Sequence, residues 1–118
     1  MKRLLITAGL AASALFAGTA SAEAVWTSGQ VQVIFAGYPG GAILFQTSGT
    51  VANPAKCSLT DSYIMTGDYD TENALQLLME AKRTGGNISF SVRSDICGTV
   101  IQQDQYGSLP VVERIALN

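Results

Sequence analysis

An alternating pattern of apolar and polar positions predicts a first strand over residues 25–35. Its later half places valine or phenylalanine at every second position, and a period of two is typical of a strand. Residues 36–41 contain three glycines and one proline, which predict a turn. A second apolar run follows at residues 42–46. We therefore expect the first two strands to form a hairpin.

A helical period of apolar positions predicts one α-helix over residues 71–84. Asp70 or Thr71 can cap its first turn, and Gly85 with Gly86 can end it in a left-handed conformation. Acidic residues at its start and basic residues at its end match the helix dipole. The apolar residues on its broad face are Ala74, Leu75, Leu77, Leu78, Met79 and Ala81.

Further strands are predicted on both sides of this helix. Residues 57–65 form the third strand, residues 111–117 form the fifth, and residues 99–102 form a short additional strand. Residues 87–93 alternate without interruption and form the fourth strand. That strand is expected to bury three apolar residues on one face, namely Ile88, Phe90 and Val92.

The order of elements is three strands, one helix and two strands, with no internal repeat or linker. Short connections favour antiparallel pairing, and one helix is too few for a sheet of βαβ units. An open sheet of this size would leave long free edges, so closure into a barrel is the economical arrangement. We predict a mainly β (α+β) protein: a small five-stranded antiparallel barrel with one helix between strands three and four.

The first 22 residues have the organisation of a secretory signal peptide. Two basic residues precede an apolar stretch over residues 4–17, and residues 20–22 read Ala-Ser-Ala, an A-x-A cleavage site. The apolar stretch is short for a membrane span, and an uncleaved anchor is the alternative. Residues 1–22 are therefore assigned to the signal peptide and residues 23–118 to a single globular domain.

Cys57 and Cys97 are the only cysteines in the sequence. An even count in an exported protein predicts one disulfide, and two redox-active thiols are the alternative, without the C-x-x-C spacing. Signal removal leaves five basic against nine acidic residues, a net charge of −4. That sign opposes binding to nucleic acid or anionic lipid. We expect a periplasmic or secreted protein with no nucleic-acid partner and no membrane span after cleavage.

The sequence contains no histidine, which removes serine-histidine and cysteine-histidine catalysis and imidazole metal ligation. Asp68, Asp70 and Glu72 look like the start of a calcium loop but lack its glycine and distal glutamate. An acid-rich helix start explains the same residues. These carboxylates could serve acid-base catalysis, yet no nucleophile accompanies them. We expect no enzyme activity, no catalytic residue, no metal and no cofactor.

The order of strands and helix over residues 23–118 resembles the OB-fold, a five-stranded Greek-key barrel with a helix between strands three and four. With a signal peptide and one disulfide, it is also similar to the B subunits of bacterial AB5 toxins, which are secreted OB-folds that assemble into pentameric rings and bind glycans. Residues 53–57 and 80–86 look like segments of small uncharacterised secreted proteins of Gram-negative bacteria. The toxin resemblance implies a self-assembling binding protein.

Two loops flank the usual binding face of an OB-fold, those that join strands one to two and four to five. Tyrosine rings among amides and a carboxylate can stack on a sugar or anchor a protein, although the same composition is ordinary for solvated loops. Trp26 is expected in the core, with sugar stacking as the alternative. The candidate binding residues on the two loops are Tyr38, Gln102, Gln103, Asp104, Gln105 and Tyr106.

These observations predict a non-catalytic binding module that recognises a glycan or a protein surface. An alternative class is a proteinaceous inhibitor of an extracellular hydrolase, in which a disulfide-tied loop would plug an active site. Ring assembly on glycans favours the first class, and one-to-one complexes with an enzyme favour the second. A small hydrolase is a third class and requires a pocket with converging titratable groups.

Overall fold

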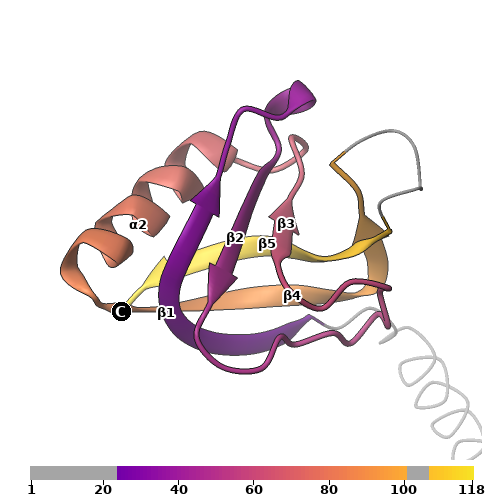
Figure 1. Cartoon of the computed structure of the whole chain (residues 1–118), viewed down its shortest axis with the longest axis horizontal. Helices are drawn as coiled ribbons and strands as arrows, with labels where there is room; N and C mark the ends of the chain where they lie inside the picture. Colours follow the sequence, from indigo (N-terminus) through magenta and orange to yellow (C-terminus); the bar gives the residue numbers. More distant parts are fainter. Residues whose placement is uncertain (1–23, 101–106) are drawn as a thin grey trace, which may run out of the picture.

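The computed structural model describes residues 24–100 and 107–118 and is mainly β. Figure 1 shows the strands wrapped around a common interior, with the helix on one side. The elements in chain order are β1 (Val25–Phe35), the short 3-10 turn η1 (Pro39–Gly41), β2 (Ile43–Thr47), β3 (Tyr63–Met65), α2 (Thr71–Thr84), β4 (Asn87–Gly98) and β5 (Leu109–Leu117).

The five strands form one closed ring in the order β1-β2-β3-β5-β4. The long strand β1 makes this closure possible because it belongs to both halves of the ring. Its first part pairs with β4 and its last part pairs with β2, and the register shifts between Val31 and Val33. Figure 1 shows β1 curving from one neighbour to the other. The predicted hairpin of β1 and β2 is confirmed.

The prediction of a fully antiparallel arrangement is wrong at one place. β3 and β5 pair in parallel, through Ile64 and Val111, whereas the other neighbouring strands are antiparallel. The reason is geometric: strand directions can alternate around a closed ring only when the number of strands is even. Five strands therefore require at least one parallel pair. The long connection through α2 and β4 leaves the direction of β5 free to meet this requirement.

Two strands differ in length from their predictions. β3 begins at Tyr63, because the chain before it makes other contacts: Asn53 Oδ1 accepts the Cys57 N–H at 2.8 Å, and the Ser58 and Leu59 N–H groups donate to Ser108. β4 continues past Arg93 to Gly98, with an irregular register against β5. Residues 99 and 100 are not in a strand, and the remainder of the short strand predicted at 99–102 lies outside the described residues.

The centre of the ring is aromatic. Phe45 and Tyr63 stack with ring centroids 5.4 Å apart, and Phe90 meets them edge-on at 5.4 and 4.8 Å. The Tyr63 hydroxyl accepts the backbone N–H of Ala52 at 2.7 Å, and burial raises the pKa of Tyr63. The fourth strand buries its three predicted core residues completely, as expected: Ile88, Phe90 and Val92.

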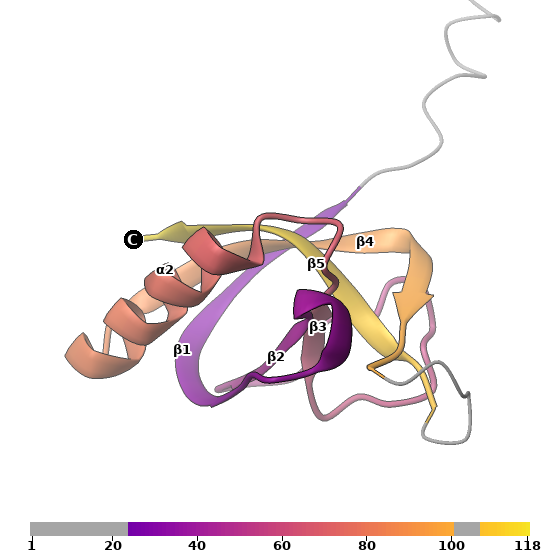
Figure 2. The same cartoon turned by 90° about the horizontal axis from the view of Figure 1, so that it is seen from above.

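Helix α2 covers the ring from one side, where it packs against β1 and β5 (Figure 2). Its bounds match the prediction, and both of its ends are capped as expected. Asp70 accepts the Asn73 N–H at the start, and Gly85 ends the helix with a φ of 71°. The face turned toward the ring is narrower than predicted, because Met79 is 58% exposed. The buried helix residues are Ala74, Leu78 and Ala81.

Candidate functional site

Tyr38 lies on the β1–β2 loop and is half-buried. Its side chain packs against a small apolar cluster at one end of the ring, which we call the end cluster: Ala42, Leu44, Ile64, Leu109 and Val111. Val100, which leads into the β4–β5 loop, packs against the same cluster. The end cluster therefore supports both loops that the sequence pointed to. Five of the predicted binding residues lie outside the described residues: Gln102, Gln103, Asp104, Gln105 and Tyr106.

The C-terminal end of the β4–β5 loop is fixed by hydrogen bonds between two serines. The Ser58 N–H donates to Ser108 Oγ at 3.1 Å, and the Ser108 N–H donates to Ser58 Oγ at 2.8 Å. The Leu59 N–H adds a bond to the Ser108 carbonyl at 2.8 Å. Gly107 has a φ of 81°, and a Cβ there would meet Ser58 Oγ at 2.8 Å, so the position requires glycine. Residues 107 and 108 are thus fixed against the β2–β3 connection.

The N-terminal end of this loop is fixed by the disulfide between Cys57 and Cys97, which confirms the predicted pairing. Cys97 lies one residue before the end of β4, and Cys57 lies in the connection between β2 and β3. The two Cα atoms are 5.7 Å apart. Covalent and hydrogen-bonded attachments therefore hold both sides of the β4–β5 loop against the same β2–β3 connection.

The β1–β2 loop is seated on the turn that follows β3. A Cβ placed on Gly67 would overlap the carbonyl group of Gly40, so these two backbones touch without room for a side chain. Gly40 has a φ of 79°, and the Gly41 N–H donates to the Tyr38 carbonyl at 3.3 Å. These contacts fix the backbone that carries Tyr38.

A charged cluster lies where β4 leaves regular pairing with β5. Arg93 donates from Nε and Nη2 to the two carboxylate oxygens of Asp95, at 2.9 and 2.5 Å, and from Nη1 to the Tyr69 hydroxyl at 3.0 Å. The bond from Arg93 lowers the pKa of Asp95, and the bond to Asp95 raises the pKa of Arg93. Both groups are therefore charged and satisfied by one another, which is the arrangement of a structural ion pair.

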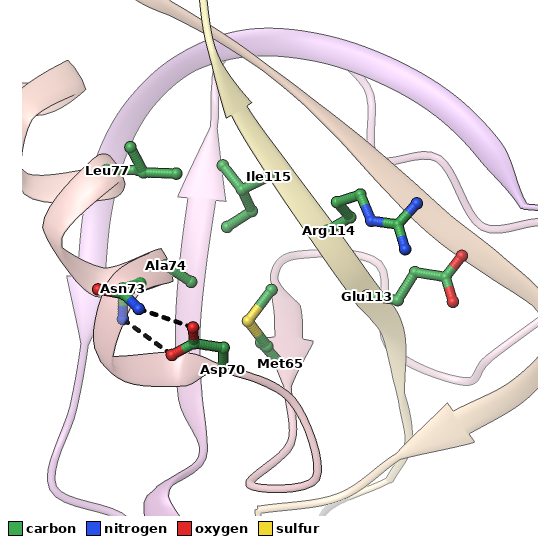
Figure 3. Close-up of a pocket in the computed structure, with 8 residues that line it drawn as sticks. All are labelled: Met65, Asp70, Asn73, Ala74, Leu77, Glu113, Arg114 and Ile115. Atoms are coloured by element: carbon green, nitrogen blue, oxygen red, sulfur yellow. Dashed lines mark hydrogen bonds between the residues drawn. The ribbon is translucent and has the colours of Figure 1, made fainter.

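A cleft of about 240 Å³ lies between the start of α2 and β5 (Figure 3). Its apolar wall consists of Met65, Ala74, Leu77 and Ile115. Asp70 lies at one end, where its carboxylate accepts bonds from the Asn73 backbone at 3.2 Å and from Asn73 Nδ2 at 2.7 Å. Those bonds lower the pKa of Asp70. Sequence reasoning did not find this cleft, because α2 and β5 meet only through the fold.

Asp70 therefore caps the start of the helix, as expected from an acid-rich helix N-terminus. In the part of the chain that the structure describes, three or more acidic or cysteine side chains do not gather into a potential metal site. None of the described helices is long and apolar enough to cross a membrane.

Trp26 is 54% exposed, so its expected place in the core is wrong. It lies beside Ser91 of β4, which in turn lies beside Arg114 of β5. Ser91 is 1% exposed, and its hydroxyl has no hydrogen-bond partner among residues 24–100 and 107–118. The alternation along the strand predicts an outward-facing Trp26, because alternate residues lie on one face and Trp26 falls on the face of the polar residues Ser28 and Gln30.

Comparisons with models of known protein families, with curated proteins and with solved structures find no match for this chain.

Proposed function

We propose that this protein is a non-catalytic binding module that recognises a glycan or a protein surface with one end of its ring of strands. The observation that carries the proposal is the shared end cluster. Tyr38 from the β1–β2 loop and Val100 from the β4–β5 loop pack against the same apolar residues. This shared contact supports the proposal that the two loops form one recognition surface.

The proposed architecture is an OB-like barrel, distantly similar to the B subunits of AB5 toxins. Three features support it: the ring order, the helix between β3 and β4, and the parallel meeting of β3 with β5. On this proposal the binding surface comprises Tyr38 and the segment from Gln102 to Tyr106, and the module can assemble with copies of itself. The toxin resemblance makes a glycan the first ligand class to test.

The proposed location is the periplasm or the outside of the cell. The disulfide between Cys57 and Cys97 supports this, because disulfides persist in oxidising compartments. Intact-mass measurement of the periplasmic fraction tests the location and the signal together. We expect a product that begins at Glu23 and has two hydrogens fewer than the reduced chain. A product that retains Met1 would contradict export through a cleaved signal.

The binding surface is tested on a glycan array with Tyr38→Ala and Tyr106→Ala. Loss of stacking should weaken binding by at least fivefold in each variant. Met79→Ala is the control, since it removes an exposed apolar side chain that belongs to α2 and not to either loop. Native mass spectrometry of the same samples reports assembly. Unchanged affinity in both tyrosine variants would reject this surface, and one-to-one complexes with a secreted hydrolase would favour the inhibitor class instead.

A further inference from the structure

The outer face of the sheet formed by β1, β4 and β5 carries three side chains in one row. Trp26 of β1 lies beside Ser91 of β4, and Ser91 lies beside Arg114 of β5. Phe90 and Val92, the neighbours of Ser91 along β4, are buried in the core, so Ser91 and the residues beside it face the other way. Neighbouring strands lie about 4.8 Å apart, and the row therefore spans about 10 Å.

Trp26 gives this row an apolar end. It is the only tryptophan in the sequence, and 54% of it is exposed. The next outward positions along β1 are polar, namely Ser28 and Gln30, and both are exposed. An exposed indole leaves a large apolar surface in water, which a ligand ring can cover.

An irregularity of β5 brings a second charged side chain to this face. Ser91 pairs with Arg114 but Val92 pairs with Val112, so Glu113 is an extra residue in β5. A bulge of this kind changes the direction of the side chain it inserts. Figure 3 shows the Glu113 and Arg114 side chains both extending away from α2. The ion pairs within the described part of the chain involve neither of them. A guanidinium that only donates and a carboxylate that only accepts are therefore available to a ligand.

The middle of the row holds a buried hydroxyl. Ser91 is 1% exposed, and its Oγ makes no hydrogen bond to any residue that the structure describes. A buried hydroxyl without a partner is unfavourable, and native proteins rarely keep one. Trp26 and Arg114 lie on either side of it and are themselves exposed, so rotation of either side chain can open the hydroxyl to a ligand.

We propose that this outer face binds one neutral sugar ring of a glycan, stacked on Trp26. Each sugar hydroxyl both donates and accepts, so neighbouring hydroxyls can bond to Arg114 and Glu113 together, and a further one can partner Ser91. A carboxylated ring would be repelled by Glu113 and by the net negative charge of the protein, and a cationic ring would be repelled by Arg114. The site shares no residue with the loop surface proposed above and stands independently of it.

Trp26 is its own reporter, because the chain contains no other tryptophan. The purified, disulfide-bonded protein is titrated with the methyl pyranosides of glucose, galactose, mannose and N-acetylglucosamine, and with glucuronate and galacturonate. At least one neutral sugar should change the tryptophan fluorescence and reduce its quenching by acrylamide about twofold at saturation. Each uronate should bind at least fivefold more weakly than the matched neutral sugar. Tighter binding of the uronates, or no response to any neutral sugar up to about 100 mM, would overturn the proposal.

Affinities of variants are measured by NMR of the sugar, because removal of Trp26 also removes the fluorescence. Trp26→Ala should weaken binding at least tenfold, and Arg114→Ala and Ser91→Ala about three- to tenfold. Ser91→Ala should keep or raise the melting temperature, because the hydroxyl that it removes has no partner, and this separates a lost ligand contact from a lost structural one. Met79→Ala, on the exposed side of α2, is the control and should bind as the wild type does.

Three results of these measurements would overturn the site. The first is unchanged affinity in Trp26→Ala, or in Arg114→Ala and Ser91→Ala together. The second is loss of binding in Tyr38→Ala, which would assign the sugar to the loop surface. The third is protection of Trp26 from acrylamide that grows with protein concentration in the absence of sugar, which would show that a second copy of the chain covers this face.

Discussion

Removal of the disulfide should cost this protein a large part of its stability. The bond joins Cys57 and Cys97, which are 40 residues apart in the sequence. In the chain-entropy description, a loop of that length restricts the unfolded chain by about 13 cal/mol/K, which is about 4 kcal/mol at 25 °C. Typical domains of this size are stable by about 5–15 kcal/mol, so the double variant Cys57→Ala/Cys97→Ala should lose about a quarter or more of that.

Urea unfolding of the wild type and the double variant measures the effect. The free energy of unfolding should fall by about 4 kcal/mol, and the melting temperature by about 15–30 °C. The denaturant slope should rise, because an unfolded chain without the crosslink exposes more surface. Reduced wild type is the control and should match the double variant. A fall of less than about 1 kcal/mol, or an unchanged slope, would refute the entropic reasoning.

Three further predictions concern the helix, a loop contact and pH. Leu78→Asp should prevent folding because it buries a carboxylate, whereas Met79→Asp, on the exposed face, should melt within a few degrees of the wild type. Gly67→Ala should lower stability by about 1–3 kcal/mol in urea unfolding, because its Cβ overlaps the Gly40 carbonyl. The folded pKa of Asp70 lies below 3.8, so its contribution is present above that pH and lost on further acidification; Asp70→Asn should flatten this loss in acid titrations.

Local patterns predicted the elements better than they predicted the pairing. The helix was found with both caps because its signals lie within residues 70–86. β3 is shorter than its composition predicts because Cys57 bonds to Asn53, and Ser58 and Leu59 bond to Ser108, contacts that the local pattern does not reveal. The parallel contact of β3 with β5 has no local signal. It follows only when closure is combined with an odd number of strands, a step that the sequence reasoning did not take.

The candidate sites divide in the same way. The disulfide, predicted from the cysteine count, is confirmed, whereas the binding role of Tyr38, inferred from its place in a glycine-rich loop, stays a prediction. The α2–β5 cleft could not be predicted, because it lies between two segments that are distant in the sequence and come together only in the folded chain. The exposure of Trp26 follows from the alternation of inward and outward positions along β1, which outweighs the general tendency of tryptophan toward burial.

The single parallel contact between Ile64 and Val111 also gives the ring a seam. Six residue pairs hold β1 to β4, and hairpin neighbours hold β1 to β2, so the ring has unequal joints. The disulfide between Cys57 and Cys97 and the bonds of Ser58 and Leu59 to Ser108 cross the ring beside this seam and hold it closed. Once the disulfide is reduced, we expect the strands to separate first at this joint, because it has the fewest strand-to-strand pairs. Sub-global opening along the seam should then precede global unfolding.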